Sequence, residues 1–192
     1  MMTALRKRSG GFTIAEVVVA SFISTLLVTS AMVLLVGMGK EQRIGLSRSQ
    51  VNAVATNTID QIAGIIRGAS RAATVTLADL KPGSTTQFYT LRFERPKGTL
   101  QEIRFDAANK RVIHDPDRSA SGNDMVLRDK ASDANSLRPY VSELYFQFPS
   151  PSDRNAVTIS MLVTDGGKAW SRWRTNAPLQ MEFTNNVILR KP

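Results

Sequence analysis

The stretch RKRSGGFTIAEVVVA, residues 6–20, joins a basic cluster to the start of a long apolar segment. This segment runs from Phe12 to Met38, and its only charged residue is Glu16. A helix of these 27 residues would reach about 40 Å, whereas the hydrocarbon core of a bilayer is about 30 Å thick. The stretch therefore predicts an N-terminal helix that can span a membrane.

The flanks of the apolar segment predict its orientation. Basic side chains gather at residues 6–8, and basic residues beside a span favour the cytoplasmic side, so we expect a single pass with a cytoplasmic N-terminus. A cleaved secretory signal has a shorter apolar core and a small-residue cleavage site after it, which this sequence lacks. A signal anchor would fit these observations, but it leaves Glu16 unexplained.

Glu16 needs an explanation because a charged side chain at the bilayer centre costs about 2.5–3.5 kcal/mol. The cost is smaller near one end of a span, but a cationic partner would still help. A cut between Gly11 and Phe12 would create an α-amino group four residues before Glu16. That amine could pair with the carboxylate of its own chain or with that of a neighbouring subunit.

The residues RKRSGG followed by FTIAEVVVA resemble the leader and mature start of type IV prepilins and pseudopilins. In that family a prepilin peptidase cuts after the glycine and methylates the new amine. The resemblance implies that Gly11 precedes the cut, that Phe12 is the modified N-terminus, and that Glu16 is the acidic fifth residue that aids subunit registration. Ala15 is smaller than the aliphatic residue usual in the family.

The resemblance also implies partners and a location. The partners are the prepilin peptidase, other pilins or pseudopilins, an inner-membrane assembly platform and the lipid bilayer, with no cofactor. The location is the inner (cytoplasmic) membrane, with the head outside the cytoplasm. The pattern IDQIAGIIRGASRA, residues 59–72, further resembles the helix end of W-type minor pilins and J-type pseudopilins, and the apolar segment lacks the proline common in major pilins.

Helical patterning continues after a predicted bend at Gly37 and Gly39. Apolar and small residues recur at spacings of four and three, which predicts an amphipathic helix with one buried stripe. The stripe consists of Val51, Ala55, Thr58, Ile62, Ile65, Ala69 and Ala72. The chain thus divides into a basic leader (1–11), a transmembrane or filament-core helix (12–38), its amphipathic continuation (39–72) and a head (73–192).

The head predicts β-structure because apolar and polar residues alternate in several short runs separated by turn signals. The residues expected to face a core are Tyr89, Leu91, Phe93, Ile103, Phe105, Leu144, Phe146, Phe148, Val157, Ile159, Met161, Val163, Leu179, Met181 and Phe183. We therefore predict an α+β fold in which a long N-terminal helix packs on an antiparallel sheet, as the family resemblance also implies.

Three features of the head are weighed as sites. His114 is the only histidine, so with no cysteine present we expect a strand-end or turn role rather than a metal site. The spacing of Asp115 and Asp117 partly resembles that of the alternating oxygen ligands in a calcium-binding loop, although a solvated loop is the favoured interpretation. In WSRWR, residues 170–174, Arg172 and Arg174 are candidate contacts for DNA or a partner, and Trp173 is expected in the core.

The sequence contains no catalytic motif and no cysteine, so we predict a structural protein rather than an enzyme. The predicted role is a minor pilin or pseudopilin at the tip of a type IV pilus or a type II secretion pseudopilus. The alternative is a signal-anchored periplasmic module, binding DNA, a surface or calcium, that never enters a filament. DNA or secreted cargo is a further expected partner.

Overall fold

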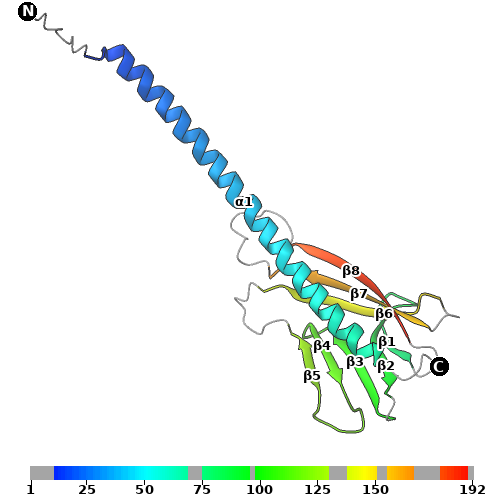
Figure 1. Ribbon diagram of the computed structural model, residues 1–192. Helices are drawn as coiled ribbons and strands as arrows, with labels where there is room; N and C mark the ends of the chain where they lie inside the picture. The colour runs from blue at the N-terminus through cyan, green and yellow to red at the C-terminus, as the bar shows by residue number, and fades with distance from the viewer. Residues whose placement is uncertain are drawn as a thin grey trace, which may run out of the picture. The chain divides into compact units, whose positions relative to one another are not determined.

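The computed structural model describes residues 11–68, 75–95, 98–129, 138–150, 155–166 and 178–189. The chain forms two compact units, residues 1–46 and 47–192. The elements are α1 (Ile14–Arg67), β1 (Thr76–Leu80), β2 (Phe88–Glu94), β3 (Leu100–Asp106), β4 (Arg111–Asp115), β5 (Met125–Arg128), β6 (Tyr140–Gln147), β7 (Ala156–Thr164) and β8 (Gln180–Ile188) (Figure 1).

In the first unit, α1 is long and apolar enough to cross a membrane. Its large apolar side chains are exposed throughout residues 14–36, so nothing in this unit covers them. The backbone stays helical through Gly37 and Gly39, where the sequence predicts a bend. The first half of the helix therefore matches the predicted membrane segment by length and composition.

In the second unit, the helix buries one stripe against the sheet. Val51, Ala55, Thr58 and Ile62 are buried as predicted. The buried face is wider than the predicted stripe, because Val54, Ile59, Ala63 and Ile66 are buried as well. The helix ends at Arg67, and the predicted continuation to residue 72 lies largely outside the described residues.

The eight strands among the described residues belong to one antiparallel sheet. The strand order is β5-β4-β3-β2-β6-β7-β8, and β1 pairs with β2 beside this path. β2 and β6 pair through a single residue pair, Phe88 and Phe146. Because this pairing is so short, the two halves of the sheet separate along β2, and β1 pairs with the remaining length of that strand. The predicted α+β layout, a long N-terminal helix on an antiparallel sheet, is confirmed.

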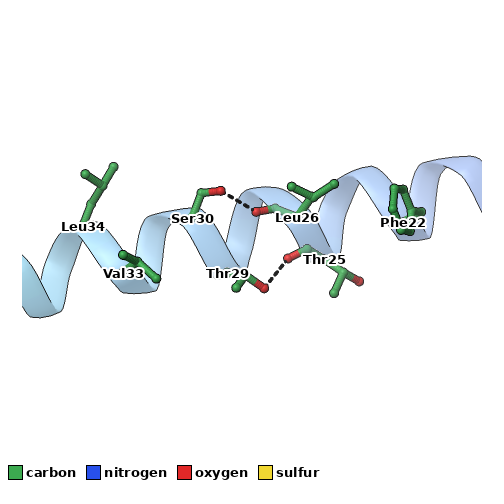
Figure 2. A pocket seen from close by; sticks show the side chains of 7 residues that line it. All are labelled: Phe22, Thr25, Leu26, Thr29, Ser30, Val33 and Leu34. Carbon is green, nitrogen blue, oxygen red and sulfur yellow. Dashed lines mark hydrogen bonds between the residues drawn. The ribbon is translucent and has the colours of Figure 1, made fainter.

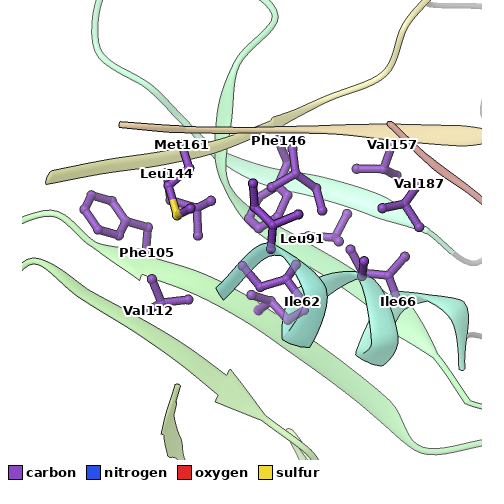
Figure 3. Close-up of a cluster of buried hydrophobic side chains, with 14 of the residues drawn as sticks. Ile62, Ile66, Leu91, Phe105, Val112, Leu144, Phe146, Val157, Met161 and Val187 are labelled. Atoms are coloured by element: carbon purple, nitrogen blue, oxygen red, sulfur yellow. The ribbon is translucent and has the colours of Figure 1, made fainter. Parts of the chain in front are cut away.

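The core lies between the helix stripe and one face of the sheet. Figure 3 shows Ile62 and Ile66 of α1 among side chains from the strands, including Leu91, Phe146 and Val187. Most residues predicted to face the core are buried, and the rest pack against it. β7 is buried on both faces, since Thr158 and Ser160 are also covered by their neighbours. The helical segment from Ser47 to Arg67 and the sheet therefore share one core within the second unit.

Candidate functional site

The start of α1 is held by hydrogen bonds between Thr13 and Glu16. The backbone N–H of Thr13 donates to the Oε2 atom of Glu16 at 2.8 Å, and the Thr13 hydroxyl donates to the same oxygen at 2.9 Å. In return, the backbone N–H of Glu16 donates to the hydroxyl oxygen of Thr13 at 3.3 Å. This reciprocal arrangement is a capping box, which satisfies backbone donors that the first helical turn leaves unpaired.

The capping box gives Glu16 a role within its own chain. The residues Thr13-Ile14-Ala15-Glu16 carry the Ser/Thr-x-x-Glu signature of this motif, which our sequence interpretation missed. A capping interaction stabilises a helix end by about 0.5–2 kcal/mol. Both side-chain bonds use Oε2, and among the described residues Oε1 accepts no hydrogen bond. The exposed carboxylate can therefore cap its helix and still accept a donor from outside.

The predicted cleavage position lies just before this cap. Gly11 and Phe12 precede the helix, and both are exposed and outside regular secondary structure. Phe12 is 86% exposed. Exposed backbone outside helices and strands is where proteolysis concentrates. The bond between these residues is therefore open to a peptidase, and cutting it would leave Thr13 and Glu16 in place.

Hydroxyl side chains within the apolar segment bond to their own helix. Ser21, Thr25, Thr29 and Ser30 each donate to the carbonyl oxygen four residues earlier, at 2.8 Å. Figure 2 shows the last two of these bonds along a shallow hollow whose lining also includes Phe22. Because each hydroxyl is satisfied within the helix, this face can lie in lipid, and small polar residues also permit close helix packing.

His114 serves the core of the head. It lies in β4 next to the end of the strand, is buried, and its Nε2 atom is 3.2 Å from the Oε1 atom of Gln101. Burial, followed by the nearby positive charge of Arg95, lowers the pKa of His114 below its usual value. The ring is therefore a neutral hydrogen-bonding group, as expected for a strand-end role.

Asp115, the last residue of β4, and Asp117, in the loop that follows, form turns. The Oδ1 atom of Asp115 accepts the backbone N–H of Asp117 at 3.0 Å. The Oδ1 atom of Asp117 accepts the hydroxyl of Ser119 at 2.6 Å and its N–H at 3.0 Å, and these bonds lower the pKa of Asp117. Among the described residues, no group of three histidine, aspartate or glutamate side chains could hold a metal ion. The hydrogen bonds of the two aspartates are those of turn-forming side chains.

Asp165 is a buried carboxylate that sequence interpretation missed. Its Oδ2 atom accepts the hydroxyl of Ser47 at 3.0 Å, and its Oδ1 atom accepts the N–H of Leu179 at 2.9 Å. The N–H of Asp165 in turn donates to the carbonyl oxygen of Leu179 at 3.0 Å. Through these hydrogen bonds Asp165 connects α1 with residues 155–166 and 178–189, the two described segments on either side of residues 167–177. Arg172 and Arg174, like Trp173, lie outside the described residues, so their predicted roles stay predictions.

Comparisons of the chain with protein-family models, curated proteins and solved structures gave no match.

Proposed function

We propose that this chain is a minor pilin or pseudopilin, a structural subunit of a type IV pilus or a type II secretion pseudopilus. The observation that carries the proposal is the placement of Glu16. Its carboxylate lies exposed in the first turn of a membrane-length helix, four residues after an accessible bond at Gly11 and Phe12. A plain membrane anchor has no need for a carboxylate at this depth.

In this proposal, assembly rests on two interactions of the first unit. The exposed apolar side chains of residues 12–38 pack against equivalent helices of other subunits. The amine at Phe12, created by cleavage, meets the Glu16 carboxylate of a neighbour. Two opposite charges 4 Å apart near a protein surface attract by about 4 kcal/mol. The pairing therefore offsets the cost of keeping an acid in an apolar environment.

The same proposal assigns the chain a place and partners. The chain lies in the inner membrane with its N-terminus in the cytoplasm, and its head lies on the other side, where it primes assembly or contacts cargo at the filament tip. Prepilin peptidase and methyltransferase act on the chain, which itself catalyses no reaction. The remaining partners are other subunits and the assembly platform.

Intact-mass measurement of the chain extracted from membranes tests the processing step. We expect loss of residues 1–11 and the gain of one methyl group at Phe12, because the Gly11–Phe12 bond is accessible. A Gly11→Leu variant serves as the control and is expected to keep its leader, since the motif requires a glycine there. A wild-type chain that keeps residues 1–11 would instead identify a signal-anchored module.

DNA binding separates the two filament systems. A pilus subunit active in DNA uptake is expected to bind DNA through Arg172 and Arg174, with affinity falling at least fivefold in the double alanine variant. A secretion pseudopilin is expected to bind none, and its deletion should stop protein export. Gel-shift measurements at fixed salt with full-length protein in detergent distinguish these results, with Arg67→Ala on the exposed helix face as the control.

A further inference from the structure

Two basic residues of α1 follow the apolar segment directly. Lys40 and Arg43 come two and five residues after Met38, the last residue of that segment, and both are exposed. The backbone is helical throughout, so both belong to the same helix as the apolar residues. All of these residues lie in the first compact unit. The helix therefore carries positive charge immediately beyond a segment that is long enough to cross a membrane.

Lys40 and Arg43 share one face of α1, on which they have no acidic neighbour. Residues three or four apart are neighbours on a helix surface, whereas residues one or two apart do not face each other. None of the positions three or four residues from either cation is acidic, and Glu41 is one residue from the first and two from the second. Lys40 also forms no salt bridge with any other described residue. This face is therefore suited to an anion from outside the chain.

The length of the helix sets the depth of this pair in a membrane. A hydrocarbon core of about 30 Å takes about 20 helical residues. Counted from Glu16 as one boundary, the core ends near Val36. Lys40 and Arg43 then lie about 6 and 10 Å beyond the core, beside a headgroup layer that is about 5–8 Å thick. Side chains on a helix tilt toward its N-terminus, which here means toward the membrane, so both cations reach back to the headgroups.

We propose that Lys40 and Arg43 bind the headgroup of an anionic phospholipid at the end of the apolar segment that is farther from Glu16. The occupant follows from continuity, because the residues that precede the pair in the same helix lie in the bilayer. Ammonium and guanidinium groups both donate hydrogen bonds to phosphate oxygens. Each basic residue close to an anionic membrane surface strengthens binding by about fivefold.

This lipid contact fixes the depth of the helix in the membrane, and it has to break when the subunit leaves the membrane for a filament. The inference rests on the membrane anchoring of the proposed function, but it does not depend on cleavage at Gly11.

Quenching of a fluorescent label in the full chain tests the contact. Because the chain has no cysteine, Val36→Cys accepts a single bimane label on the same face, four residues before Lys40. The protein is reconstituted in vesicles of equal parts phosphatidylcholine and phosphatidylglycerol, with a nitroxide on the acyl chains of one lipid or the other. We expect phosphatidylglycerol to be enriched about threefold beside the label, and this preference to weaken in high salt.

Two variants locate the preference. Lys40→Gln combined with Arg43→Gln is expected to abolish it. The control Arg48→Gln removes an exposed basic residue five positions farther along α1, beyond the headgroup layer, and is expected to keep it. Equal quenching by the two lipids in the wild-type protein, or a preference that survives the double variant, would overturn the inference.

The emission of the same label separates this inference from the proposed function. Blue-shifted emission in both kinds of protein shows that the apolar segment lies in the bilayer, so an absent lipid preference then overturns the headgroup contact alone. A label that remains in water would overturn the membrane anchoring as well. Chains with and without residues 1–11 are expected to give the same preference, because the leader lies at the other side of the bilayer.

Discussion

Under the proposed function, replacing Glu16 with glutamine is expected to remove the chain from filaments while leaving it folded and in the membrane. Glutamine at this position still completes a capping box with Thr13, so the start of α1 keeps its hydrogen bonds. Only the negative charge is lost, and with it the proposed attraction to the Phe12 amine of a neighbour. We expect at least a tenfold loss of the chain from sheared filaments, which corresponds to about 1.4 kcal/mol. Immunoblots of filament and membrane fractions measure the distribution.

Thr13→Val is the matched variant for this experiment. This variant removes the hydroxyl from the cap but keeps the carboxylate of Glu16. Incorporation of the chain into filaments is expected to fall by no more than about threefold, because only the free energy of one capping interaction is lost. The two variants separate capping from charge pairing. Wild-type incorporation of Glu16→Gln together with a severe defect in Thr13→Val would show that Glu16 acts as a helix cap and would refute the charge pairing.

Replacing Ile62 with aspartate is expected to unfold the head. Ile62 is fully buried between α1 and the sheet, in contact with the core of the second unit. Truncating a buried isoleucine costs about 2–5 kcal/mol, and an unpaired buried carboxylate adds several more. Because domains are stable by only about 5–15 kcal/mol, the variant should lose most of its folded population. Limited proteolysis and thermal melting of the full chain in detergent follow the loss.

The neighbouring variant Gln61→Asp provides the comparison. Gln61 is exposed on the same turn of α1, so the same new charge is expected to change stability by no more than about 0.5 kcal/mol. A melting temperature for Ile62→Asp equal to that of Gln61→Asp would contradict the packing of this stripe on the sheet. The pair thus tests the interface directly, without a change in net charge between the variants.

The sequence predicts a cationic partner for Glu16, in its own chain or in a neighbour, and this prediction did not include the hydrogen bonds to Thr13. Those bonds could have been predicted, since a capping box is a local pattern of four residues. The strand-end or turn role predicted for His114 agrees with its position next to the end of β4. The short strands β1 and β5 were not predicted. Neither has enough alternating residues to stand out, and each forms because a neighbouring strand offers it backbone partners.

By itself the sequence determined the apolar segment, the buried stripe of α1 and the core-facing residues of most strands. These features follow from the helical period of 3.6 and the strand period of two, which are properties of neighbouring residues. Only the tertiary structure decided which charges are buried and how the strands are ordered. Glu102 is buried because Arg92 reaches it from β2 at 2.9 Å and Arg118 from a loop at 3.2 Å. Such contacts depend on the order of the strands in the sheet. Residues far apart in the chain set that order, because they bury apolar surface against one another.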